Sequence, residues 1–507
     1  MRFHLSGAAR RTLLFTMLSM VVCALVNPGN FGTSDTLRRL HVERWIRLGE
    51  PPVRESDRAH GLKGRNGLLH PEYGIGQSLL LLPFDAAVEA TVVPVLNRRG
   101  IDAVRQQQVA ELLIAFLMQW FVTACLLALA YEVLLSFQFT PLAAMSGTMA
   151  LLFGTSCLQY VQCAQENNLI LLLALAALCA VRWWQSGRGA RWATIAGMAC
   201  GCAILVRLPS LLQTAVFLMV AVSGGGNRRR FLARFLPPVA AAILLDRWYH
   251  WYRFGELFST YTGLVGRQFR PTGAAAGFPF SYPFWKGFLG ALFSPDKSIF
   301  LFDPLLVVLL LLAGWKWRSI SGELRGLLLW LTVLLLMYMA FYATYYDFGG
   351  DVAWGDRFLS LPVQLLSLFA VPLLAMFAKA IHHVPRRAAW AAVCASVVLQ
   401  AASTMLAPSL EVIQRGEGYN DGVLVNRAVN LSEVALGRQN SPRFRGVPME
   451  WRTLYYLPFQ LRFQFPGPAA WAIAVWMALL AALPVLAFTA LRNAARWSGA
   501  APGSSDC

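Results

Sequence analysis

The sequence predicts an all-α polytopic membrane protein with about 12 transmembrane helices (about 11–13). Three observations carry this prediction. Hydrophobic residues make up 57% of the 507 residues and charged residues only 14%, whereas soluble domains carry about 25% charged residues. The mean hydropathy is +0.51. Uncharged runs of bilayer-crossing length recur along the chain. A soluble or disordered protein is therefore excluded.

Twelve apolar segments are predicted to span the bilayer. The first, Leu13–Val26, could be a signal peptide, but no small-residue cleavage site precedes Asn27, so we interpret it as a retained span. Ile75–Leu96 is interrupted by two prolines and two acidic residues, and we expect it to lie at the membrane interface. The other eleven spans are Leu112–Tyr131, Pro141–Cys157, Asn168–Val181, Trp192–Val206, Leu208–Val222, Phe235–Leu245 with its flanks, Ser298–Trp315, Leu327–Tyr346, Phe358–Ala378, Ala388–Ala407 and Ala469–Leu491.

The net charge of +18 indicates orientation. In a soluble protein, 44 Lys and Arg against 26 Asp and Glu would suggest nucleic acid as a partner. In a membrane protein, cations gather on short cytoplasmic segments, so no nucleic-acid partner is expected. With both termini in the cytoplasm, six short segments hold 18 of the cations there: Arg2/Arg10/Arg11, Arg182/Arg188/Arg191, Arg228/Arg229/Arg230/Arg234, Lys316/Arg318/Arg325, Lys379/Arg386/Arg387 and Arg492/Arg496.

This topology predicts a multi-pass protein of the cytoplasmic (inner) membrane with its long loops outside. Residues 1–407 form the main transmembrane module, whose first outer loop is 27–108. An extracytoplasmic loop (408–468), a last transmembrane helix (469–496) and a disordered cytoplasmic tail (497–507) follow. The short cytoplasmic segments leave no room for a nucleotide-binding domain, and neither GxxxxGK[ST] nor GxGxxG occurs.

Two carboxylates on the outer face are candidate catalytic groups. Asp35 follows the first span, where Ser34 or Asp35 could also simply cap a helix that runs to about Leu48, before Gly49. A carboxylate held at the membrane surface can acquire the pKa of a base. Glu166 leads into an apolar span, which is costly without a partner, although stabilisation of the helix N-terminus is an equal alternative.

Polar residues gather at three more places on the outer side. Gly64–Gln77 is a glycine-rich loop whose His70, Tyr73 and Gln77 stand at the mouth of an apolar helix, although a single histidine is more often structural. Ser294–Pro304 brings Lys297 to the mouth of another span. The third segment, Tyr345–Leu359, contains Asp347, Asp351, Trp354, Asp356 and Arg357, and its Gly349-Gly350 pair permits close approach of the backbone. Arg357 can bind a phosphate at headgroup depth, or it can pair with Asp356.

In this order the motifs resemble a known superfamily. They are the acidic residue after the first span, Gly64–Pro83 with its His70-Pro71 pair, S-P-x-K-x-x-F-x-x-x-P at Ser294, and G-G-x-x-x-W-G-x-R-F-L at Gly349. The chain resembles the GT-C superfamily of integral membrane glycosyltransferases, especially the bacterial protein-mannosyltransferase-like and aminoarabinose-transferase-like enzymes. The resemblance extends from the first span to about Pro372, and the last third matches only in hydropathy.

The resemblance implies transfer of a sugar, with inversion, from a polyprenyl-phosphate-linked donor to an acceptor on the outer face, which is an envelope glycan, lipid or protein. It implies that Asp35 acts as the base and that Glu166 is a second acidic residue. Arg357 would bind the donor phosphate, with Lys297 as a second cation. His70, Tyr73, Gln77, Asp351 and Trp354 are the expected substrate-binding residues. Asp356 departs from the family, which often has Pro or a small residue there, and His70-Pro71-Glu72 replaces the more usual Pro-Pro pair.

Elementary chemistry points the same way. Cleavage of a glycosyl-phosphate bond builds negative charge on the leaving phosphate, so cations are needed there and a base is needed across the sugar. A shared site requires Asp35 and Arg357 to lie within about 15 Å of each other. A divalent cation such as Mg²⁺ or Mn²⁺ could be bound by Asp35, Glu166, Asp347 and Asp351. Two other functions stay open: a transporter or flippase for a lipid-linked or small polar solute, and a noncatalytic membrane scaffold.

Overall fold

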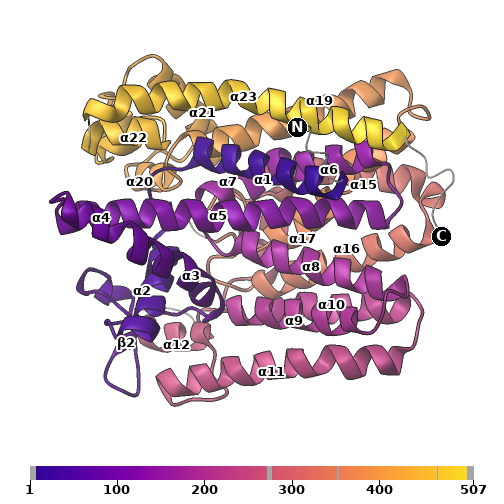
Figure 1. The fold of residues 1–507 in the computed structure, drawn as a ribbon, viewed down its shortest axis with the longest axis horizontal. Coiled ribbons are helices and arrows are strands. Elements are labelled where there is room, and N and C mark those ends of the chain that lie inside the picture. The colour runs from indigo at the N-terminus through magenta and orange to yellow at the C-terminus, as the bar shows by residue number, and fades with distance from the viewer. Residues whose placement is uncertain (1–6, 271–276, 351–352, 465, 500–507) are drawn as a thin grey trace, which may run out of the picture.

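The computed structural model describes residues 7–270, 277–350, 353–464 and 466–499. Within these ranges the chain is helical apart from turns, connecting loops and one antiparallel hairpin, in which β1 (Leu62–Lys63) pairs with β2 (Leu69–His70). Most of the long helices run side by side along the longest axis of the molecule (Figure 1). The fold is therefore that of an all-α protein, as the composition predicts.

In the described part of the chain, eight helical segments are long and apolar enough to cross a membrane. They are α1 (Gly7–Val26), α3 with α4 (Gly76–Thr91 and Val93–Arg98), α5 (Ala103–Ser136), α8 (Asn167–Gln185), α16 (Gly322–Tyr342), α17 with α18 (Ser360–Ser367 and Ala370–Phe377), α19 (His383–Met405) and α23 (Pro466–Gly499). These segments are consistent with a multi-pass membrane protein.

The number of spans differs between sequence and structure. Seven of the twelve predicted spans correspond to seven of these eight segments, and the eighth, α3 with α4, is the segment expected at the interface. The other five predicted spans form the shorter helices α6 (Pro141–Gly154), α9 (Arg191–Val206) and α10 (Ser210–Ser223), part of α11 (Arg228–Phe254), and a pair divided at Asp303, α14 (Ile299–Phe302) and α15 (Pro304–Lys316). The count of twelve and the interfacial position of Ile75–Leu96 stay predictions.

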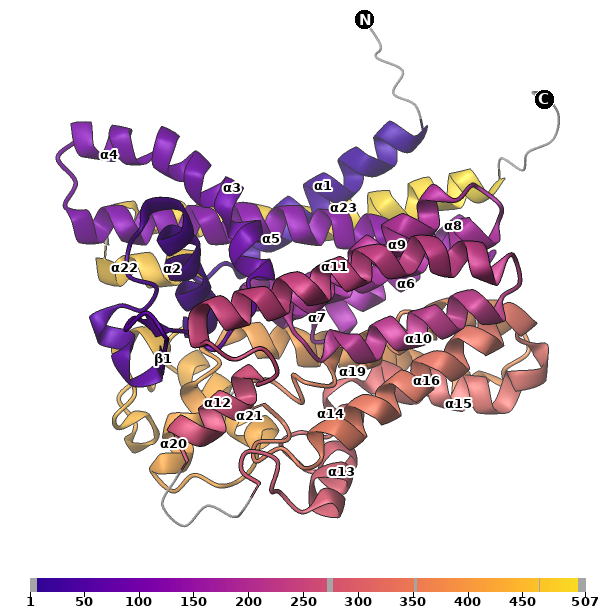
Figure 2. The same cartoon turned by 90° about the horizontal axis from the view of Figure 1, so that it is seen from below.

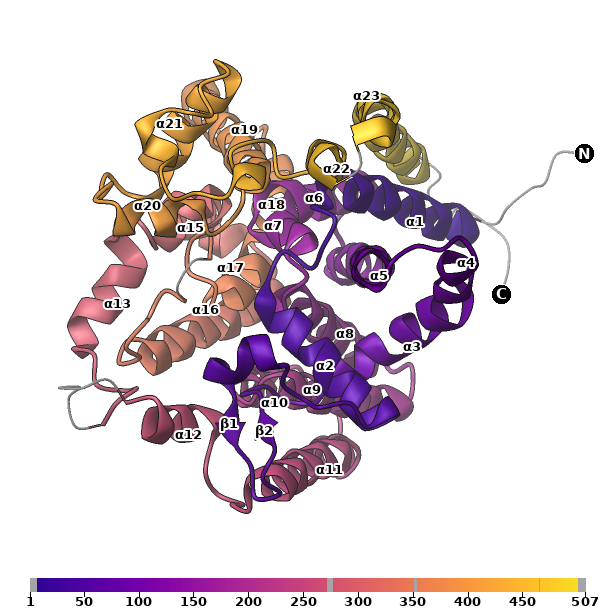
Figure 3. The same cartoon turned by 90° about the vertical axis from the view of Figure 1, so that its left-hand side faces the viewer.

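Burial separates the centre of the bundle from its rim. The most apolar 18-residue window of Ser360–Phe377 is 89% buried, whereas the corresponding window of Ala469–Arg496 has no buried residue. In the view along the bundle, α17 accordingly lies inside the ring of helices and α23 on its outside (Figure 3). Small residues bring other helices together: a Cβ at Gly201 of α9 would lie 2.8 Å from the Cβ of Ala242 in α11.

The two ends of the bundle differ. The turns that join α8 to α9, α10 to α11, α15 to α16 and α18 to α19 lie at one end, where the predicted cytoplasmic cations are found (Figures 1 and 2). The hairpin and several helices lie toward the other end: α2 (Ser34–Leu48), α12 (Tyr261–Gln268), α20 (Leu410–Gly416), α21 (Val423–Ala435) and α22 (Leu457–Gln464).

The remaining helices are short. They are α7 (Cys157–Gln162), α13 (Phe284–Phe293) and the 3₁₀ helices η1 (Glu55–His60), η2 (Trp317–Ser319), η3 (Pro442–Phe444) and η4 (Met449–Trp451). The segment predicted as a loop, 408–468, packs with the end of α19 around a small core of Leu406, Leu410, Phe444 and Val447. The last helix, α23, continues to Gly499, and residues 500–507 of the predicted tail lie outside the described residues.

Candidate functional site

The loop before α8 connects the segments that carry the candidate residues. The carbonyl of Ala164 accepts hydrogen bonds from the Thr36 hydroxyl (2.6 Å) and the Gln77 amide (2.9 Å). Its N–H donates to the carbonyl of Phe31 (2.8 Å). Gly32 is required beside it, because its φ is +67° and a Cβ would lie 3.1 Å from the loop backbone. The starts of α2 and α3 are thus fixed to the loop, and Gln77, predicted to bind substrate, makes this structural contact.

Asp35 lies in the first turn of α2, and its carboxylate contacts three other residues. The cap of this helix is Thr33, whose hydroxyl accepts from the Asp35 N–H (3.2 Å), so the Asp35 carboxylate is not used for capping. Its Oδ1 accepts a 2.7 Å hydrogen bond from the Tyr73 hydroxyl and lies 4.0 Å from Nη1 of Arg38. Its Oδ2 lies 3.4 Å from Nη1 of Arg357. The two residues expected to lie within about 15 Å are therefore in direct contact.

Glu166, at the start of α8, is held between two arginines. Its carboxylate lies 3.1 Å from Arg39 and 3.9 Å from Arg207. Burial alone would raise the pKa of Glu166, but the guanidinium groups of Arg39 and Arg207 lower it to about 2. Glu166 is therefore an anion throughout the physiological pH range, and it fixes the positions of both arginines. The Arg39 guanidinium also covers the Tyr73 ring, 4.1 Å from its centroid.

Arg207 and Arg357 lie beside the same aromatic ring. Their guanidinium carbons are 4.7 Å and 5.3 Å from the centroid of Phe358. The Phe358 ring is itself stacked on Tyr342, with centroids 4.2 Å apart and planes 2° from parallel. The side chains of Arg207 and Arg357 retain 21% and 25% of their exposure, so a ligand can reach both. Two like charges at one accessible place favour an anionic ligand.

The 353–355 segment, which leads to Arg357, contains Trp354 and is contacted by Lys297. The Lys297 ammonium donates to the carbonyls of Ala353 (2.9 Å) and Gly355 (3.1 Å), and burial lowers its pKa. The Trp354 ring is buried and packs edge to face against Phe302, with centroids 5.1 Å apart. These contacts support the segment, so a direct role of either residue with substrate stays a prediction.

The close approach predicted at the Gly349-Gly350 pair is confirmed. A Cβ at Gly349 would lie 2.5 Å from the Lys297 side chain, and a Cβ at Gly350, where φ is +75°, would overlap the Arg357 side chain.

The carboxylate of Asp356 accepts the N–H groups two and three residues further along the chain (3.0 and 3.2 Å). Asp356 therefore stabilises the turn that precedes α17, while its neighbour Arg357 pairs with Asp35.

His70 makes structural contacts. Its Nε2 is 3.2 Å from the side-chain oxygen of Asn66, and its ring packs edge to face against Trp45, with centroids 4.9 Å apart. Burial, followed by the charge of Arg253, lowers the pKa of His70 to about 4, so the ring is neutral at pH 7. These contacts fit the structural alternative for a single histidine, and its predicted role with substrate stays untested.

Arg253, near the end of α11, binds the backbone of residues 71–73. Its fully buried guanidinium donates to the carbonyls of Pro71 (2.9 Å) and Tyr73 (3.1 Å). It also lies over the Tyr249 ring, 3.9 Å from the centroid. Because the Tyr73 hydroxyl binds Asp35, residues 71–73 connect Arg253 to the Asp35 carboxylate.

Sequence reasoning gave no role to four arginines of the site. Arg38 and Arg39 lie in the same helix as Asp35, so their proximity was visible in the sequence. Arg207 separates two short apolar runs, and an ionisable residue at such a position is itself a signal of function. The contact of Arg253 with residues 71–73 had no signal, because it joins segments about 180 residues apart.

The predicted divalent cation stays a prediction for the residues that the structure describes. No group of three His, Cys, Asp or Glu side chains gathers there in an arrangement that could hold a metal ion. Asp35 and Glu166 are paired with arginines instead. Asp351, predicted both to bind substrate and to contact a metal, lies outside the described residues.

Comparisons of the chain with protein-family models, curated proteins and solved structures found no match.

Proposed function

We propose that this protein is a GT-C-type glycosyltransferase that transfers a sugar from a polyprenyl-phosphate-linked donor to an acceptor at the outer face of the cytoplasmic membrane. One observation carries the proposal. A carboxylate, Asp35, meets the accessible guanidinium of Arg357 in a single site, with Arg207 beside it. A base and a phosphate-binding pair of cations are the two parts that this reaction requires.

The proposed orientation follows from the charges of the two ends. The site is built by the loops opposite the cation-rich turns (Figure 2). With those turns in the cytoplasm, both termini are cytoplasmic and the site opens on the outer side. A lipid-linked donor would then reach the site along the membrane, with its phosphate at headgroup depth.

In the proposed reaction, Arg357 and Arg207 bind the donor phosphate, and the Asp35–Arg357 contact opens as the sugar enters between them. The acceptor hydroxyl oxygen forms a bond to C1 of the sugar as the bond from C1 to the phosphate oxygen breaks. Asp35 takes the hydroxyl proton, and the polyprenyl phosphate leaves with the bonding electron pair. The guanidinium groups interact more strongly with the phosphate as its negative charge grows, so they lower the barrier.

The other polar residues position these groups. Tyr73 donates to Oδ1 of Asp35 and thereby orients the carboxylate. Glu166 is an anion at every working pH, so we assign it to holding Arg39 and Arg207. The sugar and the acceptor, whether glycan, lipid or protein, are not distinguished by these contacts.

The test measures transfer in proteoliposomes supplied with a panel of polyprenyl-phosphate pentoses and hexoses. Asp35→Asn should lower the rate of sugar transfer about 10³-fold or more, because the acceptor loses its base. Asp57→Asn is the matched control: Asp57 is a neighbouring carboxylate that pairs with Arg38 at 3.3 Å, and this variant should stay within about threefold of wild type. Full activity of Asp35→Asn, or solute accumulation without sugar transfer, would contradict the proposal.

A further inference from the structure

A second feature lies between α15 and α16, toward the end of the bundle opposite Asp35. Here the two helices and α17 leave an apolar groove of about 310 Å³, at the lower end of the range of about 300–1,000 Å³ that ligand pockets cover. Residues that line the groove include Leu310, Gly314, Trp317, Leu329, Thr332 and Leu366. We propose that this groove binds one acyl chain of an anionic phospholipid. The inference is independent of the glycosyltransferase reaction.

The groove is apolar and open. Its one hydroxyl, that of Thr332, donates to the carbonyl of Leu328 (2.8 Å), so its hydrogen is already used. Leu310 and Leu329 are exposed by 42% and 55%, which shows that the groove opens to the outside of the bundle. Its occupant must therefore be apolar and must come from the surrounding lipid.

Gly314 forms part of the groove by its lack of a side chain. A Cβ built at this position meets no atom within 4 Å. A larger residue would therefore project into the groove without a clash against the backbone. Glycine at this position therefore leaves space for an acyl chain that a larger side chain would occupy.

Three cationic residues adjoin the lining residues in the sequence. Lys316 and Arg318 flank Trp317, which lines the groove. Arg325 precedes the lining residues Leu328 and Leu329 by one helical turn, so it lies on the same face of α16.

The nearby carboxylate of Glu323 is already bound by Arg182, at 2.6 Å. Basic groups at the end of an apolar groove between membrane helices match a phosphate headgroup, with Trp317 at the interface. An anionic phospholipid is the occupant that satisfies both parts of the groove.

The experiment counts lipids retained by the full-length protein in detergent after exposure to equal amounts of phosphatidylglycerol and phosphatidylcholine, by native mass spectrometry. Wild type should keep one phosphatidylglycerol molecule. Gly314→Leu fills the groove and should lose it. Gly326→Leu is the matched control, because a Cβ at Gly326 on α16 also meets no atom within 4 Å and Gly326 does not line the groove.

A second pair of variants keeps the shape of the groove. Arg318→Gln with Arg325→Gln should weaken phosphatidylglycerol binding about tenfold, whereas Arg386→Gln with Arg387→Gln, at another cation-rich turn, should leave it unchanged. Equal retention of phosphatidylcholine by wild type, displacement of phosphatidylglycerol by a polyprenyl phosphate, or equal binding by the two glycine variants would overturn the proposal. Circular dichroism of each variant verifies the fold.

Discussion

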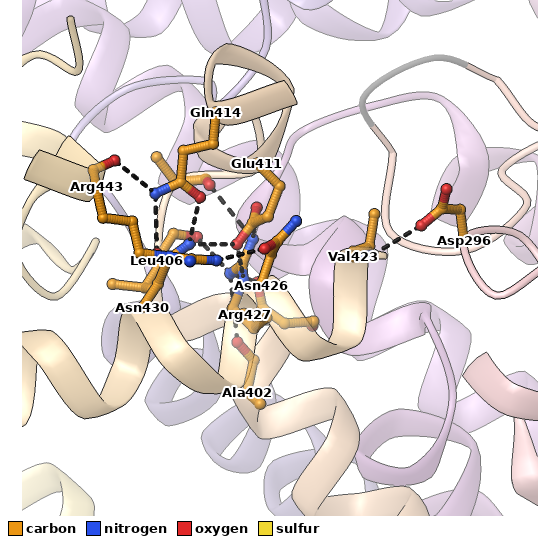
Figure 4. A network of polar contacts seen from close by, with 12 residues as sticks. Asp296, Ala402, Leu406, Glu411, Gln414, Val423, Asn426, Arg427, Asn430 and Arg443 are labelled. Atoms are coloured by element: carbon orange, nitrogen blue, oxygen red, sulfur yellow. Dashed lines mark hydrogen bonds and ion pairs between the residues drawn. The ribbon is translucent and has the colours of Figure 1, made fainter. Parts of the chain in front are cut away.

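Two arginine–carboxylate pairs at the same end of the molecule differ in almost every respect. Arg427 and Glu411 are joined by two hydrogen bonds of 2.7 Å, and each side chain is only 3% exposed. The remaining donors of Arg427 reach backbone carbonyls, among them that of Leu406 at 3.0 Å (Figure 4). Arg357 and Asp35 share one contact of 3.4 Å and are 25% and 19% exposed.

The difference separates a structural pair from a pair able to exchange partners. The Arg427–Glu411 pair is closed, because its polar atoms are satisfied within the protein and water is excluded. The Arg357–Asp35 pair is open: within the described chain its single guanidinium–carboxylate hydrogen bond leaves most of the five Arg357 donors available to a ligand. A catalytic pair that must open for each substrate needs the second arrangement.

Breaking the closed pair should have the largest effect, on stability. Arg427→Met leaves Glu411 buried without a counter-charge, which costs about 3–5 kcal/mol. Arg415→Met is the matched control from the same segment, because the Arg415–Asp296 pair is 37% and 27% exposed and is worth about 1 kcal/mol or less. Thermal unfolding of the purified protein checks the comparison. Equal losses from the two substitutions would remove the distinction between closed and open pairs.

Breaking the open pair should instead affect the use of donor. Arg357→Ala removes a cation from the proposed phosphate site and should lower kcat/KM for the lipid-linked sugar about 10²-fold, by a lower kcat as well as a higher KM, with little change in unfolding temperature. Arg267→Ala, at an exposed pair with Glu256 (2.6 Å), should leave the KM unchanged. An unaltered donor dependence of Arg357→Ala would refute its assignment.

The pH dependence of the free energy of unfolding should report on the buried His70 side chain, with an effect smaller than that of breaking the closed pair. Because its pKa falls from 6.5 to about 4 on folding, the folded state binds fewer protons than the unfolded state. The stability that neutral His70 contributes is therefore fully present above pH 6.5 and is lost as the pH falls toward 4. The loss in the free energy of unfolding is about 2 kcal/mol at pH 5. His70→Gln should lack this loss. If the free energies of unfolding of wild type and His70→Gln changed equally between pH 7 and pH 5, this contribution of His70 would be excluded.

The smallest effect is expected from the residues that orient Asp35. Tyr73→Phe and Arg253→Lys should each lower kcat about tenfold, since each loosens the same carboxylate. If Arg253 acts through Tyr73, the double variant should be no slower than the slower single variant. Additive losses would show that Arg253 affects activity by another route.

The individual helices could be predicted from the sequence better than the contacts between segments that are far apart in the chain. Helix α2 ends after Leu48, as predicted, and Gly49 follows in the left-handed conformation; this end could be predicted because a glycine signal is local. The division of the predicted span Ser298–Trp315 at Asp303 was not foreseen. Asp303 is buried and accepts the Ser156 N–H (3.2 Å), a contact from a distant segment that supports a break within an apolar run.

The candidate site shows the same limit. Asp35, Glu166 and Arg357 could be chosen from the sequence because each is a charged residue at the end of an apolar segment. The arrangement of Glu166 between Arg39 and Arg207 could not be, since it depends on how α2, the end of α9 and the start of α8 pack against one another. Likewise, Trp354 was visible as an outer aromatic residue, but its burial became clear only in the fold.

The most direct test of the central claim is an experimental structure of the wild-type protein with a polyprenyl-phosphate sugar bound. We expect the phosphate to contact Arg357 and Arg207, the Asp35–Arg357 contact to be broken, and the sugar to lie between Asp35 and the phosphate. A phosphate bound elsewhere, with the Asp35–Arg357 contact intact, would contradict the central claim.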